Sequence, residues 1–383
     1  MRHQNSVFHD LLKLVPWGIF DGRVEAYGAD TGVRRLTTKS QLVAMLYAQL
    51  SGACSLREIE AGLASHAQRL YHLGATPARR STLAEANAHR PAAVFVELFA
   101  HMARTAHRGL RRKVAESVYL IDATGVRLTA ASEWARFSAT TCGAKVHVIY
   151  DDAADQPIYA AVSAANVNDI TAAQAMPIEA GATYVFDLGY YDYAWWAKLH
   201  AAGCRIVTRF KTNTPLACTS ERPVAEGGPI LSDRIGHLPA RQAASRKNPF
   251  ADPVREVRVK IETGKVLRIL SNDLKASAEE IADLYKRRWA IELFFRWVKQ
   301  TLKIRTFLGT SENAVRIQIA VALIAYLLLR LARAAHKTPL KPLLFARLVR
   351  ANLMHRRRVD ELLRPERRRP NHGDQIAFSW ART

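Results

Sequence analysis

The first hundred residues carry apolar side chains at three- and four-residue spacing, which is the period of an amphipathic helix. Four segments follow this pattern and are predicted as helices: Ser6–Leu14, Lys39–Leu50, Ser55–Ala64 and Ala92–His107. Ser55 and Glu58 form a capping box at the start of the third segment. The beginning of the chain is therefore expected to be all-helical.

A short basic turn precedes a further helix in this region. Residues 76–80 form the turn, and Ser81 opens the helix, which together have the shape of a helix-turn-helix. This places Arg79, Arg80 and Arg90 near a DNA backbone. Helix pairs in ordinary bundles show the same pattern, so DNA contact here is one of two interpretations.

From Ser117 the apolar pattern changes from the period of helices to that of strands. Six short stretches are predicted as strands: Val118–Ile121, Val126–Thr129, Ala144–Tyr150, Pro157–Ser163, Tyr184–Phe186 and Arg205–Thr208. Two segments among them are predicted as helices: Asn168–Glu179 and Asp192–Ala202. Adjoining strands followed by alternating helices and strands predict a mixed sheet flanked by helices, an α/β (α+β) architecture.

The segment Lys211–Leu274 interrupts this alternation. It is rich in Pro, Gly, Ser and Arg, and it then contains two strands, Val254–Glu262 and Lys265–Ser271, joined by a tight turn at residues 263–264. We expect a β-rich insertion whose first half is flexible and basic. Its cations would form a DNA-contacting surface: Arg209, Lys211, Arg241, Arg246, Lys247, Arg255, Arg258 and Lys260.

The segment Ala278–Ile304 contains no Gly or Pro and has helical spacing throughout. One narrow face of the helix carries Tyr285, Arg288, Glu292, Arg296, Lys299 and Lys303. An ordinary surface helix would look similar, since Arg288 and Arg296 each lie four residues from Glu292. A single carboxylate among basic and phenolic groups suits a face that meets phosphates and a metal ion.

The last part of the chain is again helical. Ser311–Ala335 is a long apolar segment, and its longest apolar run, Ile319–Leu329, is too short to span a bilayer, so we expect a buried core helix. Pro339–Met354 is a further predicted helix. Arg356–Arg369 contains many arginines and is predicted as a basic tail.

The chain has 383 residues, of which 49% are hydrophobic, and this is enough for two or three domains with their own cores. The run His107–Lys113 is a predicted linker. The expected parts are a helical, DNA-binding domain, the first part of a catalytic core, the insertion, the second part of the core, and a C-terminal helix with the tail: residues 1–112, 113–210, 211–274, 275–336 and 337–383.

The formal charge of +22 predicts a polyanionic partner, and nucleic acid is the usual one. The four cysteines lie far apart without a CxxC pair, which argues against a zinc site or a disulfide framework and fits a reducing cytosol. No apolar signal-peptide region is present at the N-terminus. We expect a soluble cytoplasmic protein with no membrane segment.

Asp122 and Asp187 each follow a short apolar strand. Open sheets build their sites where strands end, although a single Asp there is more often a turn or cap residue. Together with Glu292 these acids could hold two Mg²⁺ or Mn²⁺ ions, which prefer oxygen ligands. Two such ions would activate a water or a 3′-hydroxyl and stabilise the leaving oxygen of a phosphodiester.

The spacing Tyr285-x2-Arg288-x3-Glu292-x6-Lys299 resembles the Y-x2-R-x3-E-x6-K signature of bacterial DDE transposases of the insertion-sequence-four family. Surrounding blocks are also similar to those of that family: VYLIDATG at 118–125, GAKVHVIYD at 143–151, AANVNDI at 164–170, VFDLGYYDY at 185–193 and FLGTSENAVRIQIAVALIAYLLL at 307–329. The resemblance covers roughly residues 118–329.

The resemblance implies an RNase H-like catalytic core with a β-rich insertion, preceded by helices and followed by C-terminal helices. Three residues take the roles of catalytic metal ligands: Asp122, Asp187 and Glu292. Three others take the contacts with transposon-end phosphates: Tyr285, Arg288 and Lys299. Further DNA contacts are expected at Arg79, Arg80, Arg296 and Lys211.

The implied activity is an endonuclease and strand-transfer reaction on double-stranded DNA in bacterial DNA transposition and recombination. The enzyme would use two Mg²⁺ ions, with Mn²⁺ as a substitute, cut at the inverted-repeat ends, and join the freed 3′-hydroxyl groups to target DNA. It would act as a homodimer in a synaptic complex near the nucleoid. Some family members flip a base onto an aromatic residue, and Trp289 and Trp297 are the candidates here, because the insertion has no Trp.

Two other functions stay open. A related RNase H-like nuclease would share the acids without needing the full Tyr–Arg–Lys face. A sequence-specific DNA-binding protein with a decayed catalytic core would keep end binding and lose cleavage. The presence of all three acids and of Tyr285, Arg288 and Lys299 argues against decay.

Overall fold

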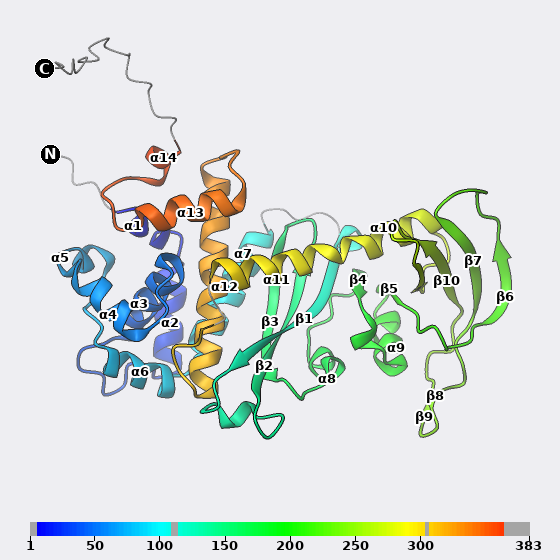
Figure 1. Ribbon diagram of the computed structural model, residues 1–383, viewed down its shortest axis with the longest axis horizontal. Coiled ribbons are helices and arrows are strands. Elements are labelled where there is room, and N and C mark those ends of the chain that lie inside the picture. The colour runs from blue at the N-terminus through cyan, green and yellow to red at the C-terminus, as the bar shows by residue number, and fades with distance from the viewer. Residues whose placement is uncertain (1–5, 109–113, 303–305, 364–383) are drawn as a thin grey trace, which may run out of the picture.

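The computed structural model describes residues 6–108, 114–302 and 306–363. Helices gather around α12 (Glu312–Ala335) at one end of the molecule, and a large sheet with its own helices forms the other end (Figure 1). Three predicted features lie partly or wholly outside the described residues: residues 109–113 of the linker predicted at 107–113, Lys303, and the part of the basic tail from residue 364. Residues 107–108 of the predicted linker belong to the last helix of the N-terminal part.

The N-terminal helices are α1 (Val7–Leu12), α2 (Trp17–Ala26), α3 (Thr38–Ser51), α4 (Leu56–Ala64), α5 (Ala67–Leu70), α6 (Arg80–His89) and α7 (Ala92–Arg108). The four helices predicted from the apolar pattern are confirmed, and the Ser55 hydroxyl caps α4 as expected. Helix α2 was not predicted. It contains Gly18 and Gly22 and buries only Phe20, so its sequence carries little apolar periodicity.

Helix α12 is the central helix of this end of the molecule. Ser311 caps its first turn by accepting a hydrogen bond from the Ala314 N–H. The helix is long and apolar enough to cross a membrane, but 83% of its most apolar window is buried inside the protein, as in the core helix of a soluble protein. It packs on α1, α3, α6 and α7, and the Asn313 side chain donates to the carbonyls of Asn87 and Arg90.

The sheet has nine strands in the order β3-β2-β1-β4-β5-β11-β10-β7-β6. Their bounds are β1 Val118–Leu128, β2 Cys142–Asp151, β3 Gln156–Ala164, β4 Thr183–Phe186, β5 Arg205–Arg209, β6 Ala217–Arg222, β7 Ile230–His237, β10 Val254–Lys260 and β11 Val266–Ser271. Strands β1, β2 and β3 are antiparallel, and β4 and β5 run parallel to β1. Three antiparallel strands followed by two parallel ones are the arrangement of an RNase H-like core.

Two details of this core differ from the sequence-based expectation. The predicted strands at 118–121 and 126–129 are one continuous strand, β1, because β2 pairs along its length from Tyr119 to Leu128. The predicted helix at 168–179 is shorter: α8 covers Asp169–Gln174 and ends before Pro177, whose ring disfavours a helical residue before it.

The inserted segment does not form a separate sheet. Strand β11 pairs with β5, so β10, β7 and β6 extend the main sheet, and the two-stranded hairpin of β8 (Arg241–Ala243) and β9 (Arg246–Lys247) projects from it. The expected flexible first half is wrong, since β6 and β7 lie there. Arg255 is 1% exposed and donates to Asp233 on β7, so this arginine serves the core of the sheet and is not part of a DNA-contacting surface.

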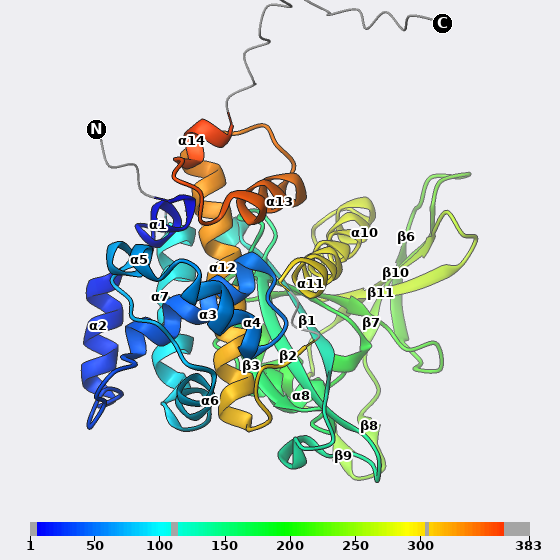
Figure 2. The ribbon, with the colours of Figure 1, turned by 60° about the vertical axis from the view of Figure 1, so that its left-hand side comes forward.

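Helices cover both faces of the sheet (Figures 1 and 2). Helices α10 (Ala278–Arg287) and α11 (Trp289–Thr301) lie on one face, and α8 and α9 (Tyr193–Ala201) lie on the other. Strand residues alternate between two cores: Leu120 and Val185 belong to the α10–α12 side, and Tyr119 and Tyr184 to the α9 side. Helices α13 (Pro342–Asn352) and α14 (Val359–Leu362) complete the end near α12.

Candidate active site

The register of β1 and β4 brings two of the predicted acids together. The strands run parallel, and Ile121 lies opposite Phe186. Asp122 follows Ile121 directly, and Asp187 follows Phe186 directly. Leu120 lies two positions before Asp122 on the α10–α12 side of the sheet. Because side chains alternate along extended backbone, both carboxylates face that same side. Asp122 lies inside β1 and not at its end, but the parallel pairing with β4 ends at that position.

The predicted single helix at 278–304 is two helices that meet at Arg288. The Arg288 N–H donates to the Tyr285 carbonyl, and the Ile291 N–H donates to the Arg288 carbonyl, both at 3.2 Å. These hydrogen bonds join residues three positions apart, as in a 3₁₀-helix, so the backbone is wound more tightly for one turn. The direction of the helix continues through this turn. Tyr285, Arg288 and Glu292 stay on one side, as the helical spacing predicted.

Arg288 lies between two of the acids. Its Nη1 is 3.4 Å from Asp122 Oδ2, and its Nη2 donates to Glu292 Oε1. Its guanidinium carbon lies 5.9 Å from the centroid of the Tyr285 ring. The side chains of Arg288, Asp122 and Glu292 are 16%, 18% and 30% exposed, so the two ion pairs are only partly screened by water.

Backbone donors hold the two strand acids. The Ala123 N–H donates to Asp122 Oδ1, and the Gly189 N–H donates to Asp187 Oδ1, both at 2.8 Å. Burial raises the pKa of Asp122 to about 6, and the neighbouring Asp187 and Glu292 carboxylates add to this rise. The Ala123 N–H and the Arg288 guanidinium act in the opposite direction. The three acids therefore form one electrostatic unit.

The three carboxylates suit a hard divalent cation. Within the residues that the structure describes, no three Asp, Glu, His or Cys side chains are close enough to hold a metal ion as they stand. Arg288 is the cation that pairs with Asp122 and Glu292 in this structure. A carboxylate with a raised pKa beside two further acids gains from added positive charge, and oxygen-only donors favour Mg²⁺ or Mn²⁺. The donor set fits such an ion.

Other predicted DNA contacts lie on exposed parts of the same region. Arg296 is exposed and places its guanidinium 5.9 Å from the centroid of the Trp289 ring. Lys211 follows β5 and places its Nζ 4.3 Å from the centroid of the Tyr191 ring. Lys299 is partly exposed on α11. These positions are accessible to a DNA backbone, and their contacts stay a prediction.

The N-terminal arginines divide into two groups. Arg79 and Arg80 are exposed at the start of α6, and Arg80 lines a pocket of about 660 Å³ together with Arg57 on α4. Arg90 is 8% exposed, and its guanidinium donates to the Leu36 carbonyl and to Gln41 Oε1. Our expectation that Arg90 lies near a DNA backbone is therefore wrong, because its donors are used inside the helical core.

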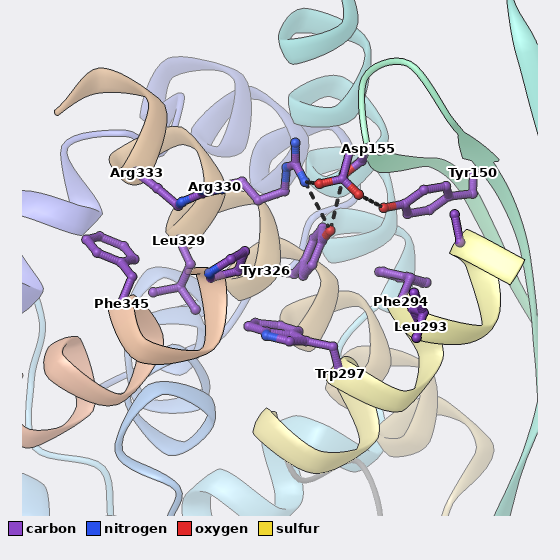
Figure 3. A pocket seen from close by; sticks show the side chains of 12 residues that line it. Tyr150, Asp155, Leu293, Phe294, Trp297, Tyr326, Leu329, Arg330, Arg333 and Phe345 are labelled. Carbon is purple, nitrogen blue, oxygen red and sulfur yellow. Dashed lines mark hydrogen bonds and ion pairs between the residues drawn. The ribbon is translucent and has the colours of Figure 1, made fainter. Parts of the chain in front are cut away.

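The two tryptophans of α11 lie in different surroundings. Trp297 lines a pocket of about 230 Å³ between α11, α12 and α13, with its ring centroid 5.1 Å from that of Tyr326 (Figure 3). In the same pocket Asp155 accepts hydrogen bonds from Tyr150 and Arg330. Trp289 is 52% exposed. Of the two candidates for stacking on a base, Trp289 is the accessible one.

Three residues near the acids received no role from the sequence. Lys145 on β2 donates to Asp169 Oδ1 at 2.9 Å, and Tyr190 is fully buried behind Asp187. All three lie in sequence blocks that carry the family resemblance: Lys145 in GAKVHVIYD, Asp169 in AANVNDI and Tyr190 in VFDLGYYDY. Membership of these blocks is the signal that could have pointed to them.

Comparison with known proteins shows which families and proteins this chain is similar to. Residues 114–328 match the family described as "Transposase DDE domain", and residues 3–76 match a "Domain of unknown function (DUF4372)". A Sinorhizobium fredii protein assigned as transposase y4zB is 41% identical over 292 residues, which are 76% of this chain and 82% of that protein.

Two further proteins are similar to this chain. A Geobacillus stearothermophilus protein assigned as the transposase of insertion sequence element IS5377 is 32% identical over 205 residues, or 51% of each chain. The solved piggyBac transposase synaptic complex with hairpin DNA aligns with 94% of this chain and 82% of its own, at a TM-score of 0.45 and 12% identity.

Proposed function

This chain belongs to the family of transposases with a DDE domain, and we propose that it moves an insertion sequence of the insertion-sequence-four family. One observation carries the proposal: Asp122 and Asp187 lie side by side in the sheet, and Arg288 links Asp122 to Glu292 on the helix above them. Residues that are far apart in the sequence thus form one acidic centre inside the matched region.

Asp122, Asp187 and Glu292 would hold two Mg²⁺ ions, with Mn²⁺ as a substitute. DDE transposase domains generally use divalent metals, which when bound supply charge stabilisation to the reacting phosphodiester and activate its nucleophile. The raised pKa of Asp122 supports this assignment, because the buried carboxylate is ionised most readily when positive charge is near. The Gly189 and Ala123 N–H groups fix one oxygen of each strand acid, and the other oxygen of Asp122 is the one that Arg288 holds and a cation would take over.

Tyr285, Arg288 and Lys299 would bind the phosphates next to the cleaved bond. Arg288 already holds two carboxylates, so the arrival of divalent cations would free its guanidinium for a phosphate. In the first step water attacks the phosphodiester at the transposon end, and the broken bond leaves a 3′-hydroxyl and a 5′-phosphate. In the second step that 3′-hydroxyl attacks a target phosphodiester, so one bond forms as one breaks.

The wider assembly follows from charge and position. Arg79, Arg80, Arg296 and Lys211 are exposed cations outside the acidic centre and would contact the DNA backbone, consistent with the net charge of +22. The partner would be the two inverted-repeat ends, held by a homodimer in the bacterial cytoplasm at the nucleoid, and then the target DNA. The accessible Trp289 would be the surface for a flipped base.

The test is cleavage of a labelled duplex that carries the end of the host element, with Mg²⁺, with Mn²⁺ and with chelator. Wild type is compared with Glu292→Gln, which keeps the shape of the side chain and removes its charge. Glu279→Gln is the matched control, because Glu279 is an exposed acid in the first turn of α10. We expect nicking at the repeat boundary that needs metal, is abolished in Glu292→Gln with end binding retained, and is unchanged in Glu279→Gln.

The other outcomes decide between the alternatives. End binding without cleavage in either metal would favour a decayed, sequence-specific DNA-binding protein. Equal cleavage of unrelated duplexes would favour an RNase H-like nuclease.

A further inference from the structure

A fourth carboxylate lies beside the three acids of the proposed centre. Asp169 begins α8, and the Cβ of an alanine placed at Gly189 would lie 3.0 Å from Asp169 Oδ2 and 3.0 Å from Asp187 Oδ1. Asp169 Oδ2 and Asp187 Oδ1 are therefore separated by no more than the sum of these two distances. Both oxygens lie next to Gly189, which has no side chain to keep them apart. Two carboxylates this close repel each other unless positive charge or a donor lies near them.

Asp169 is held from the side away from Asp187. Lys145 Nζ donates to Asp169 Oδ1 at 2.9 Å and to the Val167 carbonyl at 3.0 Å, which fixes the start of α8 against β2. His147 is 1% exposed on the same strand and has its Nδ1 3.9 Å from Asp169 Oδ1. These contacts occupy Oδ1 and leave Oδ2 facing Gly189 and Asp187.

The Tyr190 hydroxyl is a buried donor without an acceptor. The side chain is fully buried, and its oxygen makes no hydrogen bond within the described residues. Burial raises the pKa of Tyr190, and the negative charges of Asp122, Asp169 and Asp187 add to the rise. A hydroxyl buried without a partner is costly, which indicates a site that is completed by a further group.

We propose that Asp169, held by Lys145, is a positioning residue of the divalent-cation site and raises its affinity by acting on Asp187. The inference rests on the proposed function, because it takes Asp187 as a cation ligand. Asp169 keeps a second negative charge beside Asp187 and keeps the turn of Leu188–Tyr190 in place, with the Gly189 N–H on Asp187 Oδ1. Lys145 prevents Asp169 from turning to other partners, and Tyr190 supplies the donor that the occupied cluster uses.

The test measures Mn²⁺ binding by the full chain without DNA, from the electron paramagnetic resonance signal of free Mn²⁺. Asp169→Asn keeps the size of the side chain and removes its charge, and we expect Mn²⁺ binding to weaken on the order of tenfold, as for removal of one charge a few ångström from a partly buried ion. Asp283→Asn is the matched control. Asp283 pairs with Arg287 at 3.1 Å but is 58% exposed, so its variant should bind Mn²⁺ as wild type does.

A second variant tests the same relationship without removing a charge. Gly189→Ala introduces the Cβ that would press on Asp169 Oδ2 and Asp187 Oδ1. We expect it to weaken Mn²⁺ binding in the same direction, while circular dichroism matches wild type. If Asp169→Asn fails to fold, Gly189→Ala decides the question.

The outcomes separate this inference from the proposed function. If Asp187→Asn abolishes Mn²⁺ binding and Asp169→Asn and Gly189→Ala leave it unchanged, Asp169 has only a structural role and the inference is overturned. If Asp187→Asn also leaves Mn²⁺ binding unchanged, the metal-ligand assignment of the proposed function fails with it.

Discussion

Arg288 Nη1 and Asp122 Oδ2 lie 3.4 Å apart, although 166 positions separate the two residues in the chain. This ion pair joins the junction of α10 and α11, which carry Tyr285 and Glu292, to the strand that carries the first acid. It also means that, without metal or DNA, one guanidinium offsets only part of the negative charge of the acidic centre. Cation binding and phosphate binding are therefore linked through Arg288. A cation on the carboxylates would release Arg288 for a phosphate, and a phosphate on Arg288 would release the carboxylates for a cation.

The raised pKa of Asp122 predicts how stability depends on pH. An Asp in the unfolded chain has a pKa of about 3.9, whereas the pKa of Asp122 in the folded protein is raised to about 6. Between these two pH values the folded protein binds a proton at Asp122 that the unfolded chain has lost. The contribution of Asp122 to the stability of the metal-free protein therefore falls from about pH 4 to pH 6 and stays lower above this range. Asp122→Asn should remove the penalty and stabilise the protein by about 3 kcal/mol at pH 8, with no difference well below pH 4.

Urea unfolding in chelator at the two pH values measures this. Asp283→Asn, at an exposed position, should show no such pH-dependent gain. A less stable Asp122→Asn protein at pH 8 would mean that the pair with Arg288 outweighs the cost of burial.

Arg288 and its neighbour Arg287 should differ sharply in end binding. Arg288→Met removes the guanidinium that would hold an end phosphate, and the absence of such a charged hydrogen bond weakens binding on the order of tenfold or more. Arg287 pairs with Asp283 and is 47% exposed, so Arg287→Met should stay within about threefold of wild type. Fluorescence anisotropy with the end duplex in Mg²⁺, read before the duplex is cleaved, gives both affinities. Equal reductions would indicate a general charge effect.

Arg255 should matter for stability and not for DNA. It is 1% exposed and paired with Asp233, which is 4% exposed, so Arg255→Met leaves an unpaired buried carboxylate and should cost about 3–5 kcal/mol. Arg258→Met on the same strand should cost less than about 1 kcal/mol, because Arg258 is 38% exposed and Glu256 keeps its pair with Arg268. Chemical denaturation measures both. Adding Asp233→Leu to Arg255→Met should restore much of the stability.

The salt dependence of DNA binding tests the N-terminal arginines. Arg79 and Arg80 are exposed at the start of α6. Each arginine–phosphate ion pair that is removed should reduce the magnitude of the slope of log affinity against log salt by about 0.9, so loss of both should reduce it by about 1.8. The double Arg79→Ala, Arg80→Ala variant should keep its melting temperature. Arg90→Ala should instead lower the melting temperature, because Arg90 bonds inside the helical core. An unchanged salt slope in the double variant would exclude this helix from the DNA interface.

The sequence could place the acids on strands but could not show why they meet. The apolar run before Asp122 and the run before Asp187 were both visible, and the helical spacing correctly grouped Arg288 with Glu292. Their convergence depends on the parallel register of Ile121 with Phe186, which is a contact between segments far apart in the chain. Local periodicity contains no information on such a pairing.

Burial of charged residues was the other property that the sequence concealed. Arg90 and Arg255 look like surface cations, yet each is enclosed by acceptors contributed by distant segments. The tightened turn at Arg288 also had no local signal, because the segment contains neither Gly nor Pro. The strands β6 and β7 were not predicted, because their segment is rich in polar and turn-forming residues. Strand β6 is the exposed edge of the sheet, so it needs few apolar residues and shows no strand pattern.

The position of α12 has a consequence for synthesis of the protein on the ribosome. Helices α3, α6 and α7 bury apolar side chains against α12, which is made only after the whole sheet. At about 5–20 residues per second, the early helices wait roughly 10 to 60 s for this partner, with an apolar surface open to solvent. We therefore expect newly made chains to bind chaperones through this surface until residue 335 has emerged.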